Sequence, residues 1–295
     1  MQLASGTLCC NGYKRLMRSF DWLIYTGALG LMLAVIFAIA PDAGAPAPAP
    51  PSEFAEQFAQ EIGPLLPAPS PLDEMVLVQI GEPQNGVGTA FAVNEKGDWL
   101  TARHVVEGCT KVTLEVASGN YVPVAKVAID DGHDLALLST GRSPFPVTLD
   151  LAAPLRIGDA GFAVGFPQGE PGELATQLVA RSRLVTRGKR EGDAPILAWA
   201  EIGRTEGLEG TLGGISGGPM FDAHGAVRGV IVAESPRRGR LYTTSPQAIE
   251  AFLTTQGVPI EPGPAETFEL SGYGAPSDNA RRRLQVVKVT CEVGK

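Results

Sequence analysis

Histidine, cysteine and aromatic residues are all scarce in this chain. Among 295 residues there are three histidines and four cysteines, and aromatic side chains make up 6% of the total. Histidine and cysteine do not occur at metal-ligand spacing, so we expect no metal site and no cofactor. The shortage of histidine also limits the candidates for a general base to His104, His133 and His224.

Positive charge is also in short supply. The chain has 24 lysines and arginines against 32 aspartates and glutamates, which gives a net charge of -8. The one basic run, Arg281–Arg283, is too short to offset this balance, so we expect no nucleic-acid partner. Because 44% of the residues are hydrophobic and 19% are charged, the chain can bury one large core or two smaller ones.

Charge is missing altogether from residues 22–40, "WLIYTGALGLMLAVIFAIA". Such a stretch, at about 1.5 Å per residue, comes close to the roughly 30 Å of a bilayer's hydrocarbon core, so we expect a transmembrane helix here. Lys14, Arg15 and Arg18 precede it, which predicts cytoplasmic residues 1–21 and an exported remainder. The alternative is a cleaved signal peptide, but the apolar stretch is long for one, and proline follows "AIA".

The exported part is expected to be all-β. A linker rich in proline and alanine spans residues 41–72, and short strand-like segments follow from Met75, in two groups that divide near residue 150. Two such groups predict two β-barrels packed together. A C-terminal helix is expected in "SPQAIEAFLTTQG", which starts at Ser245 and ends at Gly257. The tail, residues 258–295, is expected to be a loop with one strand, "LQVVKVTCEV".

Two cysteines lie in the part predicted to be exported, Cys109 and Cys291. An even number of cysteines in an oxidising compartment predicts a disulfide between them. The alternative is a pair of unpaired buried thiols.

Three separate motifs carry the residues of a nucleophilic site. His104 lies in "LTARHVVEGC", Asp134 begins "DLALLS", and Ser216 lies in the glycine-rich "LGGISGGPMFD". The chain order His, Asp, Ser is one of three orders known for this triad. "GISGG" also matches the G-x-S-x-G turn of α/β-hydrolases, but that fold needs an acid and then a histidine after the serine, and His224 follows too closely.

These motifs, with "GDAGFAVGFPQG" and "GGPMFDAHGAVRGVIV", occur in matching order over residues 75–257, and the chain resembles the trypsin-like serine proteases, specifically the HtrA/Deg type exported by bacteria. The resemblance implies two six-stranded antiparallel barrels with the site between them. It implies that Ser216 attacks a peptide carbonyl, that His104 takes and returns the proton, and that Asp134 orients the imidazole. The N–H groups of Gly214 and Ser216 would form the oxyanion hole.

The chain departs from relatives of this type at two places. Ile215 stands where digestive enzymes have aspartate and HtrA-type enzymes often have asparagine, which leaves open how the oxyanion loop is ordered. Gly210 occupies the base of the specificity pocket, so cleavage after arginine or lysine is not expected. The pocket wall is expected from Ile231, Val232 and Ala233, which would favour small or medium apolar side chains.

The sequence therefore predicts a single-pass protein of the bacterial inner membrane, with a serine endopeptidase domain in the periplasm at residues 73–257. Its partners would be protein or peptide substrates, and an oligomer is compatible with the resemblance. The 38 residues after Gly257 are too few for the PDZ domain common in such relatives. The alternative hypothesis is a catalytically silent member whose cleft binds a peptide or an envelope protein, and a third is that the tail docks a partner.

Overall fold

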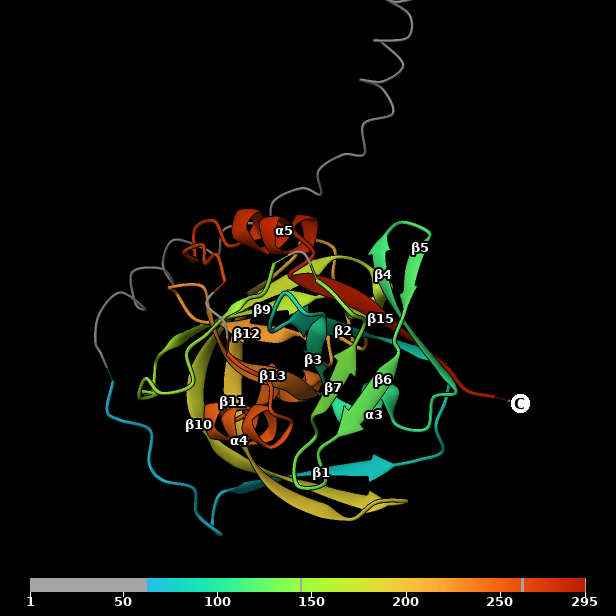
Figure 1. The fold of residues 1–295 in the computed structure, drawn as a ribbon. Coiled ribbons are helices and arrows are strands. Elements are labelled where there is room, and N and C mark those ends of the chain that lie inside the picture. Colours follow the sequence, from blue (N-terminus) through green and yellow to red (C-terminus); the bar gives the residue numbers. More distant parts are fainter. Residues whose placement is uncertain (1–62, 144, 261–262, 295) are drawn as a thin grey trace, which may run out of the picture. The chain divides into compact units, whose positions relative to one another are not determined.

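The computed structural model describes residues 63–143, 145–260 and 263–294 (Figure 1). Within these ranges no helix is both long and apolar enough to cross a membrane. The transmembrane helix expected at residues 22–40 lies outside the described residues, as does the linker up to residue 62.

The first sheet is built mainly from the first half of the chain. Seven strands pair in the order β5-β4-β15-β2-β3-β7-β6, and every pairing is antiparallel. One strand, β15, comes from the tail and lies between β2 and β4 (Figure 1). The strands are β2 (Gly86–Ala92), β3 (Asp98–Thr101), β4 (Lys111–Ala117), β5 (Asn120–Pro123), β6 (Lys126–Ile129), β7 (Ala136–Ser139) and β15 (Val286–Glu292).

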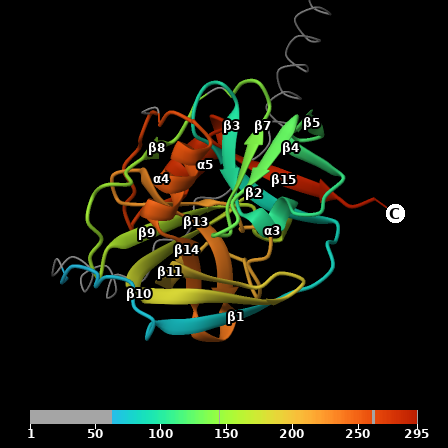
Figure 2. The same ribbon diagram turned by 60° about the horizontal axis from the view of Figure 1, so that its bottom comes forward.

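The second sheet has eight strands, of which six close a ring. The ring runs β9-β10-β11-β14-β13-β12 and returns to β9, because β10 pairs with both β11 and β9. Outside the ring, β1 runs parallel to β10 along its edge (Figure 2), and β8 runs parallel to β13. The strands are β1 (Glu74–Ile80), β8 (Thr148–Leu149), β9 (Ala160–Gly165), β10 (Gly172–Gly188), β11 (Gly192–Arg204), β12 (Pro219–Phe221), β13 (Ala226–Ser235) and β14 (Arg240–Thr244).

The expectation of two six-stranded antiparallel barrels is therefore corrected in detail. The sheets have seven and eight strands. Two pairings are parallel, that of β1 with β10 and that of β8 with β13. The extra strand of the first sheet comes from the tail, and β1, the first segment of the first group in sequence, joins the second sheet. Alternating apolar residues predict that a segment is a strand, but they do not select its partner.

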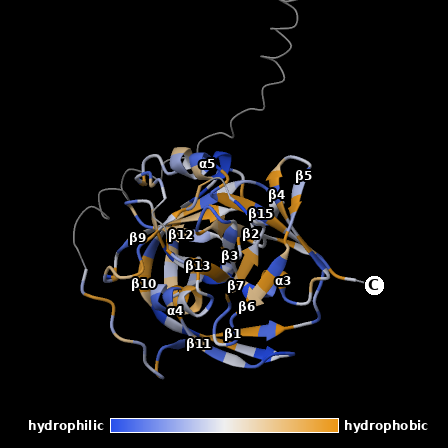
Figure 3. Ribbon diagram, in the orientation of Figure 1, coloured by the Kyte–Doolittle hydropathy of each residue, from blue (hydrophilic) through white to orange (hydrophobic). Residues whose placement is uncertain are grey.

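Two of the helices lie toward the C-terminus. The expected helix is α4 (Pro246–Thr255), whose first turn is capped by the Ser245 side chain, which accepts a hydrogen bond from the N–H of Ala248 at 3.2 Å. The tail contains a further helix, α5 (Gly274–Arg282), that the sequence analysis did not expect. Figure 3 shows that its residues are mainly hydrophilic. A four-residue helix, α3 (Arg103–Val106), and two short 3-10 helices, η1 (Pro167–Gly169) and η2 (Pro236–Arg238), complete the described elements.

The tail is an integral part of the domain, so the division expected at residue 257 is not a structural boundary. Besides contributing β15, it is joined to the first sheet by a disulfide between Cys109 and Cys291. Arg281 of α5 forms an ion pair with Glu173 of β10 at 2.6 Å, and both side chains are buried. The third hypothesis, a docking tail, stays a prediction, because the structure shows that the tail is structural and does not test what it binds. Part of the expected linker also packs against the domain, since Leu66 is buried in the core of the second sheet, although Leu65 and Leu72 are exposed.

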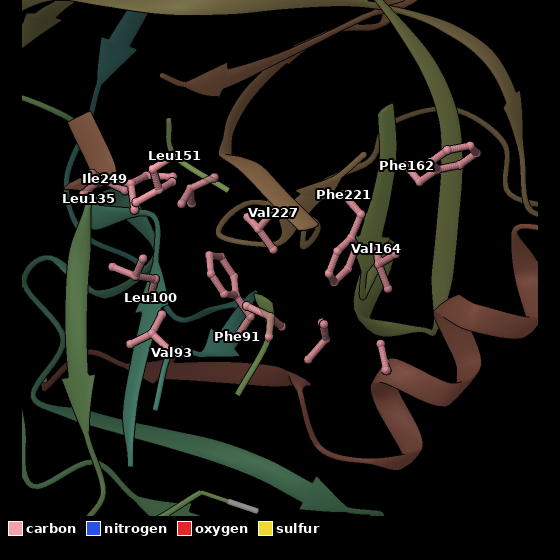
Figure 4. Close-up of a cluster of buried hydrophobic side chains, with 14 of the residues drawn as sticks. Phe91, Val93, Leu100, Leu135, Leu151, Phe162, Val164, Phe221, Val227 and Ile249 are labelled. Atoms are coloured by element: carbon pink, nitrogen blue, oxygen red, sulfur yellow. The ribbon is translucent and has the colours of Figure 1, made fainter. Parts of the chain in front are cut away.

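The main core lies between the two sheets. Figure 4 shows Phe91 and Leu100 of the first sheet facing Phe221 and Val227 of the second, with Ile249 of α4 at one side. These side chains are at most 4% exposed, so the two sheets bury one continuous apolar layer. The layer fixes the two sheets against each other and thereby fixes the segments that meet at their junction.

Candidate active site

His104 lies on α3, directly after β3. Strand β3 is buried and pairs with β2 and β7, so α3 starts from a fixed position at the edge of the first sheet. The ring of His104 is 36% exposed, whereas the neighbouring Arg103 side chain is buried. His104 therefore reaches the surface while its backbone stays on a rigid support.

Asp134, just before β7, holds both the backbone and the ring of His104. One carboxylate oxygen accepts a hydrogen bond from the His104 N–H at 3.0 Å, and the other is 2.6 Å from Nδ1. Asp134 is 7% exposed, so a charged partner is needed to offset its burial. The two contacts place the Nδ1 proton toward Asp134 and leave Nε2 of His104 free to accept a proton.

The pair shifts the pKa of both members. Burial lowers the pKa of His104, but the charge of Asp134 and the hydrogen bond to it outweigh burial, and the pKa is raised above its ordinary value. Burial raises the pKa of Asp134, but the charge of His104 and its hydrogen bonds outweigh this, and the pKa is lowered. Asp134 is thus an anion at neutral pH, and His104 is a stronger base than a free histidine.

Ser216 reaches the same region on a loop between β11 and β12. Its carbonyl accepts a hydrogen bond from the Thr89 N–H of β2 at 2.8 Å, which ties the loop to the first sheet. The next residue, Gly217, has φ +86°, and a Cβ there would lie 2.2 Å from the carbonyl oxygen of Thr89 and 2.9 Å from the nitrogen of Ala102. Glycine is therefore required for this close approach of the Ser216 loop to the start of α3.

The backbone N–H groups of the Ser216 loop differ in whether they have a hydrogen-bond acceptor. Five of the seven from Leu212 to Gly218 donate to an acceptor within the domain. The two that have no acceptor among the described residues are those of Gly214 and Ser216. Backbone donors left without a partner beside a serine are available to a bound oxygen. Gly214, one of these two residues, has a positive φ of +102°.

Ile215 lies between these two donors and anchors the loop. Its side chain is 2% exposed and packs in the core of the second sheet. Its N–H donates to the carbonyl of Leu212 at 2.9 Å, and its carbonyl accepts from the N–H of Gly218 at 2.9 Å. An apolar residue at this position is therefore compatible with an ordered loop, because burial holds the side chain.

His104, Asp134 and Ser216 all line one cleft of about 760 Å³. No hydrogen bond joins Ser216 to His104 in the described part of the chain, although both face this cleft. Hydrogen bonds between catalytic groups are often long in the absence of substrate and shorten when it binds. The structure thus brings two of the three residues into contact and places the third in the same cleft.

Two of the four residues expected to form the specificity pocket line the cleft, and two do not. Val232 and Ala233 line the cleft. Ile231 is buried in the core of the second sheet and does not line the cleft, because a β-bulge between Ile231 and Ala233 changes which side chains face outward. Gly210 is exposed on a loop and does not line the cleft either, and its carbonyl lies 3.3 Å from Nη1 of Arg204.

The structure also adds charged residues to the cleft that the sequence analysis did not select. Arg103 lies 3.9 Å from Asp134 and 3.6 Å from Glu107. Arg190, on the turn between β10 and β11, pairs with Glu107 at 3.1 Å and so connects the second sheet to α3. Glu234 lines the cleft beside Ala233. Arg103 directly precedes the selected histidine, and Glu234 directly follows Ala233, which was expected in the pocket wall, so both had a signal in their sequence position.

Among the described residues, no group of three histidine, cysteine, aspartate or glutamate side chains could hold a metal ion.

Comparison with known proteins finds a family model that matches part of the chain. Residues 88–230 match the sequence profile of the trypsin-like peptidase domain. The protein named uncharacterized protein y4bJ of Sinorhizobium fredii is 26% identical over 223 residues, which cover 70% of this chain and 32% of that protein. A probable periplasmic serine endoprotease DegP-like of Chlamydia trachomatis is 28% identical over 147 residues, which cover 50% of this chain and 28% of that protein.

A plant protein and a solved structure are similar as well. Protease Do-like 5, chloroplastic, of Arabidopsis thaliana is 31% identical over 172 residues, which cover 52% of this chain and 50% of that protein. The chain thus spans between 28% and 50% of the length of these three relatives. The active form of the Rv3671c protease of M. tuberculosis is 19% identical, with a TM-score of 0.48 and coverage of 68% of this chain and 96% of that one.

Proposed function

We propose, on the premise that this chain contains a trypsin-like peptidase domain, that it acts as a serine endopeptidase with Ser216 as nucleophile. The observation that carries the proposal is the meeting of two features in one cleft. One is the buried Asp134 bonded to Nδ1 of His104, and the other is the serine loop whose free N–H groups are those of Gly214 and Ser216.

In the proposed mechanism, Oγ of Ser216 attacks the carbonyl carbon of the scissile peptide while Nε2 of His104 takes its proton. Asp134 fixes the ring and stabilises the imidazolium that forms. The N–H groups of Gly214 and Ser216 donate to the oxyanion of the tetrahedral intermediate. His104 then gives its proton to the leaving amine, and a water activated by the same imidazole hydrolyses the acyl-enzyme.

The wall of the cleft supports a preference for small or medium apolar side chains beside the scissile bond. Val232 and Ala233 present apolar groups there, close to Ser216. The one carboxylate on the same stretch, Glu234, is engaged by backbone and hydroxyl donors. A substrate lysine or arginine would therefore have to compete for this carboxylate, which disfavours basic side chains.

We further propose that residues 22–40 anchor the protein in the bacterial inner membrane, with the peptidase domain in the periplasm. The uncharged stretch and the basic residues before it support this orientation. The disulfide between Cys109 and Cys291 fits an oxidising compartment. Alkaline carbonate extraction of membranes and alkaline phosphatase fusions after residues 21 and 62 test the two parts: resistance to extraction, with activity only in the second fusion, is expected.

The activity is tested with fluorescently labelled, unfolded casein and the purified full chain. Hydrolysis by wild type that is lost in Ser216→Ala and His104→Ala is expected, and mass spectrometry of the products gives the residue before each cleaved bond. A wild type that binds casein without cleaving it would favour the alternative of a peptide-binding protein. Products cut mainly after lysine or arginine would refute the proposed preference.

A further inference from the structure

The loop that carries the two free N–H groups is rich in glycine and needs external support. In "EGTLGGISGG", Glu209–Gly218, half of the residues are glycine. Glycine loses more conformational freedom on folding than any other residue, so such a loop is not held in shape by its own backbone preferences. The side chains that contact the loop therefore determine where its N–H groups point.

Glu234, on β13, is one of the side chains that contact this loop from outside it, and Gln168, whose side-chain amide donates to the carbonyls of Glu209 and Thr211, is another. Its two carboxylate oxygens accept hydrogen bonds from the N–H of Leu212, at 3.0 Å and 2.9 Å. One of them also accepts a hydrogen bond from the hydroxyl of Thr211. The same hydroxyl oxygen accepts a hydrogen bond from the N–H of Gly213 at 3.2 Å. One carboxylate thus engages three consecutive residues, directly or through Thr211.

The contact with Leu212 leads directly to the oxyanion donors. The carbonyl of Leu212 accepts the N–H of Ile215, which closes a turn around Gly213 and Gly214. The turn leaves the N–H of Gly214, and that of Ser216 after it, without a partner inside the described domain. A shift of Leu212 would therefore rotate the peptide planes that present both groups to the cleft.

We propose that Glu234 is a positioning residue that holds the oxyanion donors in place. This inference rests on the proposed peptidase function. The carboxylate comes from the wall of the cleft rather than from the loop itself, so it ties the loop to β13, which is fixed between β12 and β14. It acts together with the N–H of Gln168, which donates to the carbonyl of Gly213, and the hydroxyl of Thr89, which donates to the carbonyl of Gly214. A charged acceptor suits this role because hydrogen bonds to carboxylates are about twice as strong as neutral ones.

The kinetic test compares Glu234→Ala, Glu234→Gln and a control, Glu266→Ala. Glu266 also accepts hydrogen bonds through its side chain, from Asn279, but it does not line the cleft. A fluorogenic peptide taken from a mapped casein cleavage site gives kcat and KM. For Glu234→Ala we expect kcat and kcat/KM to fall together by roughly 10–100-fold with KM nearly unchanged, because the donors act in the transition state. Glu234→Gln, which keeps one acceptor oxygen, should lose less, and Glu266→Ala should match wild type.

A raised KM with unchanged kcat in Glu234→Ala would overturn the proposal, since it would make Glu234 a substrate contact only. Activity of this variant within twofold of wild type would overturn it as well. Equal loss in Glu266→Ala would assign the effect to general destabilisation.

A second measurement does not depend on activity. Hydrogen–deuterium exchange of the native full chain reports the protection of individual N–H groups. In Glu234→Ala the N–H of Leu212 should exchange roughly 10–100-fold faster, while that of Gly217, bonded to the carbonyl of Ile231, should be unchanged. Unchanged exchange at Leu212 would refute the positioning role. If wild type neither cleaves nor reacts with serine-directed probes, the proposed function fails, and this exchange experiment still decides what Glu234 does.

Discussion

Replacing Gly217 by alanine should separate the serine loop from the first sheet. The added Cβ would lie 2.2 Å from the carbonyl oxygen of Thr89 and 2.2 Å from Oγ1 of Thr101. A heavy atom is not tolerated at this distance, and the carbonyl belongs to a buried strand that cannot move alone. The loop must therefore shift away from α3, and Ser216 must move with it.

The expected loss has two parts, and a matched variant separates them. Gly207 has a positive φ close to that of Gly217, +79° against +86°, but a Cβ at Gly207 meets nothing within 4 Å. Alanine in a left-handed conformation costs about 1–2 kcal/mol, which applies to both variants. Overpacking adds about 1–3 kcal/mol for Gly217→Ala alone, giving about 2–5 kcal/mol in total.

Urea unfolding, followed by tryptophan fluorescence, measures the two free energies of unfolding. The rate of labelling by a fluorophosphonate probe measures the reactivity of Ser216. A displacement of Ser216 by about 1 Å should slow this labelling roughly 100-fold. Gly207→Ala should label at the wild-type rate. Equal stability losses in the two variants, together with wild-type labelling of Gly217→Ala, would show that the loop does not pack on the first sheet as described.

Three further predictions test other parts of the account. The pKa of His104 is raised above the ordinary 6.5, so the imidazole takes up its proton, and stops acting as a base, at a pH above 6.5. We therefore expect kcat/KM to fall as the pH drops through a midpoint above 6.5. A midpoint at or below 6.5 would contradict the described ion pair. Replacing Cys109 and Cys291 by serine should lower the free energy of unfolding by about 2–5 kcal/mol in urea, since the disulfide closes a loop across a sequence separation of 182 residues; no change would mean that the tail is held without it. Arg281→Ala should lower this free energy by about 3–5 kcal/mol because it leaves Glu173 buried without its cation, and a loss under 1 kcal/mol would show that water replaces the arginine.

The groups proposed to react could be selected from the sequence because each lies in a short, local motif. His104 follows a strand and begins a helical turn, and Gly214 with Ser216 lies in a loop whose glycines are required by close backbone contacts. Helix α4 was also predictable, since Ser245 caps it and the helix ends before Gly257, whose φ is +66°. Local signals of this kind do not depend on the rest of the fold.

The features that the sequence did not reveal depend on contacts distant along the chain. Nothing within β15 says that it lies between β2 and β4, because the strand pattern fits any sheet with a buried face. Helix α5 has no apolar periodicity, and its buried residues are small, such as Ser277 and Ala280. The β-bulge that sends Ile231 into the core instead of the cleft is likewise a matter of pairing with β14. Glu234 became a candidate once its contacts with the loop before Ser216 were known.

In the proposed mechanism Ser216 is a nucleophile activated by His104 in an assembled site. Fluorophosphonate labelling of the purified full chain, beside Ser216→Ala and His104→Ala, tests it most directly, because the probe reacts with a serine only when its base and oxyanion donors are in place. We predict labelling of the wild type that both substitutions abolish. Absence of labelling in the wild type, or labelling that persists in Ser216→Ala, would contradict the account.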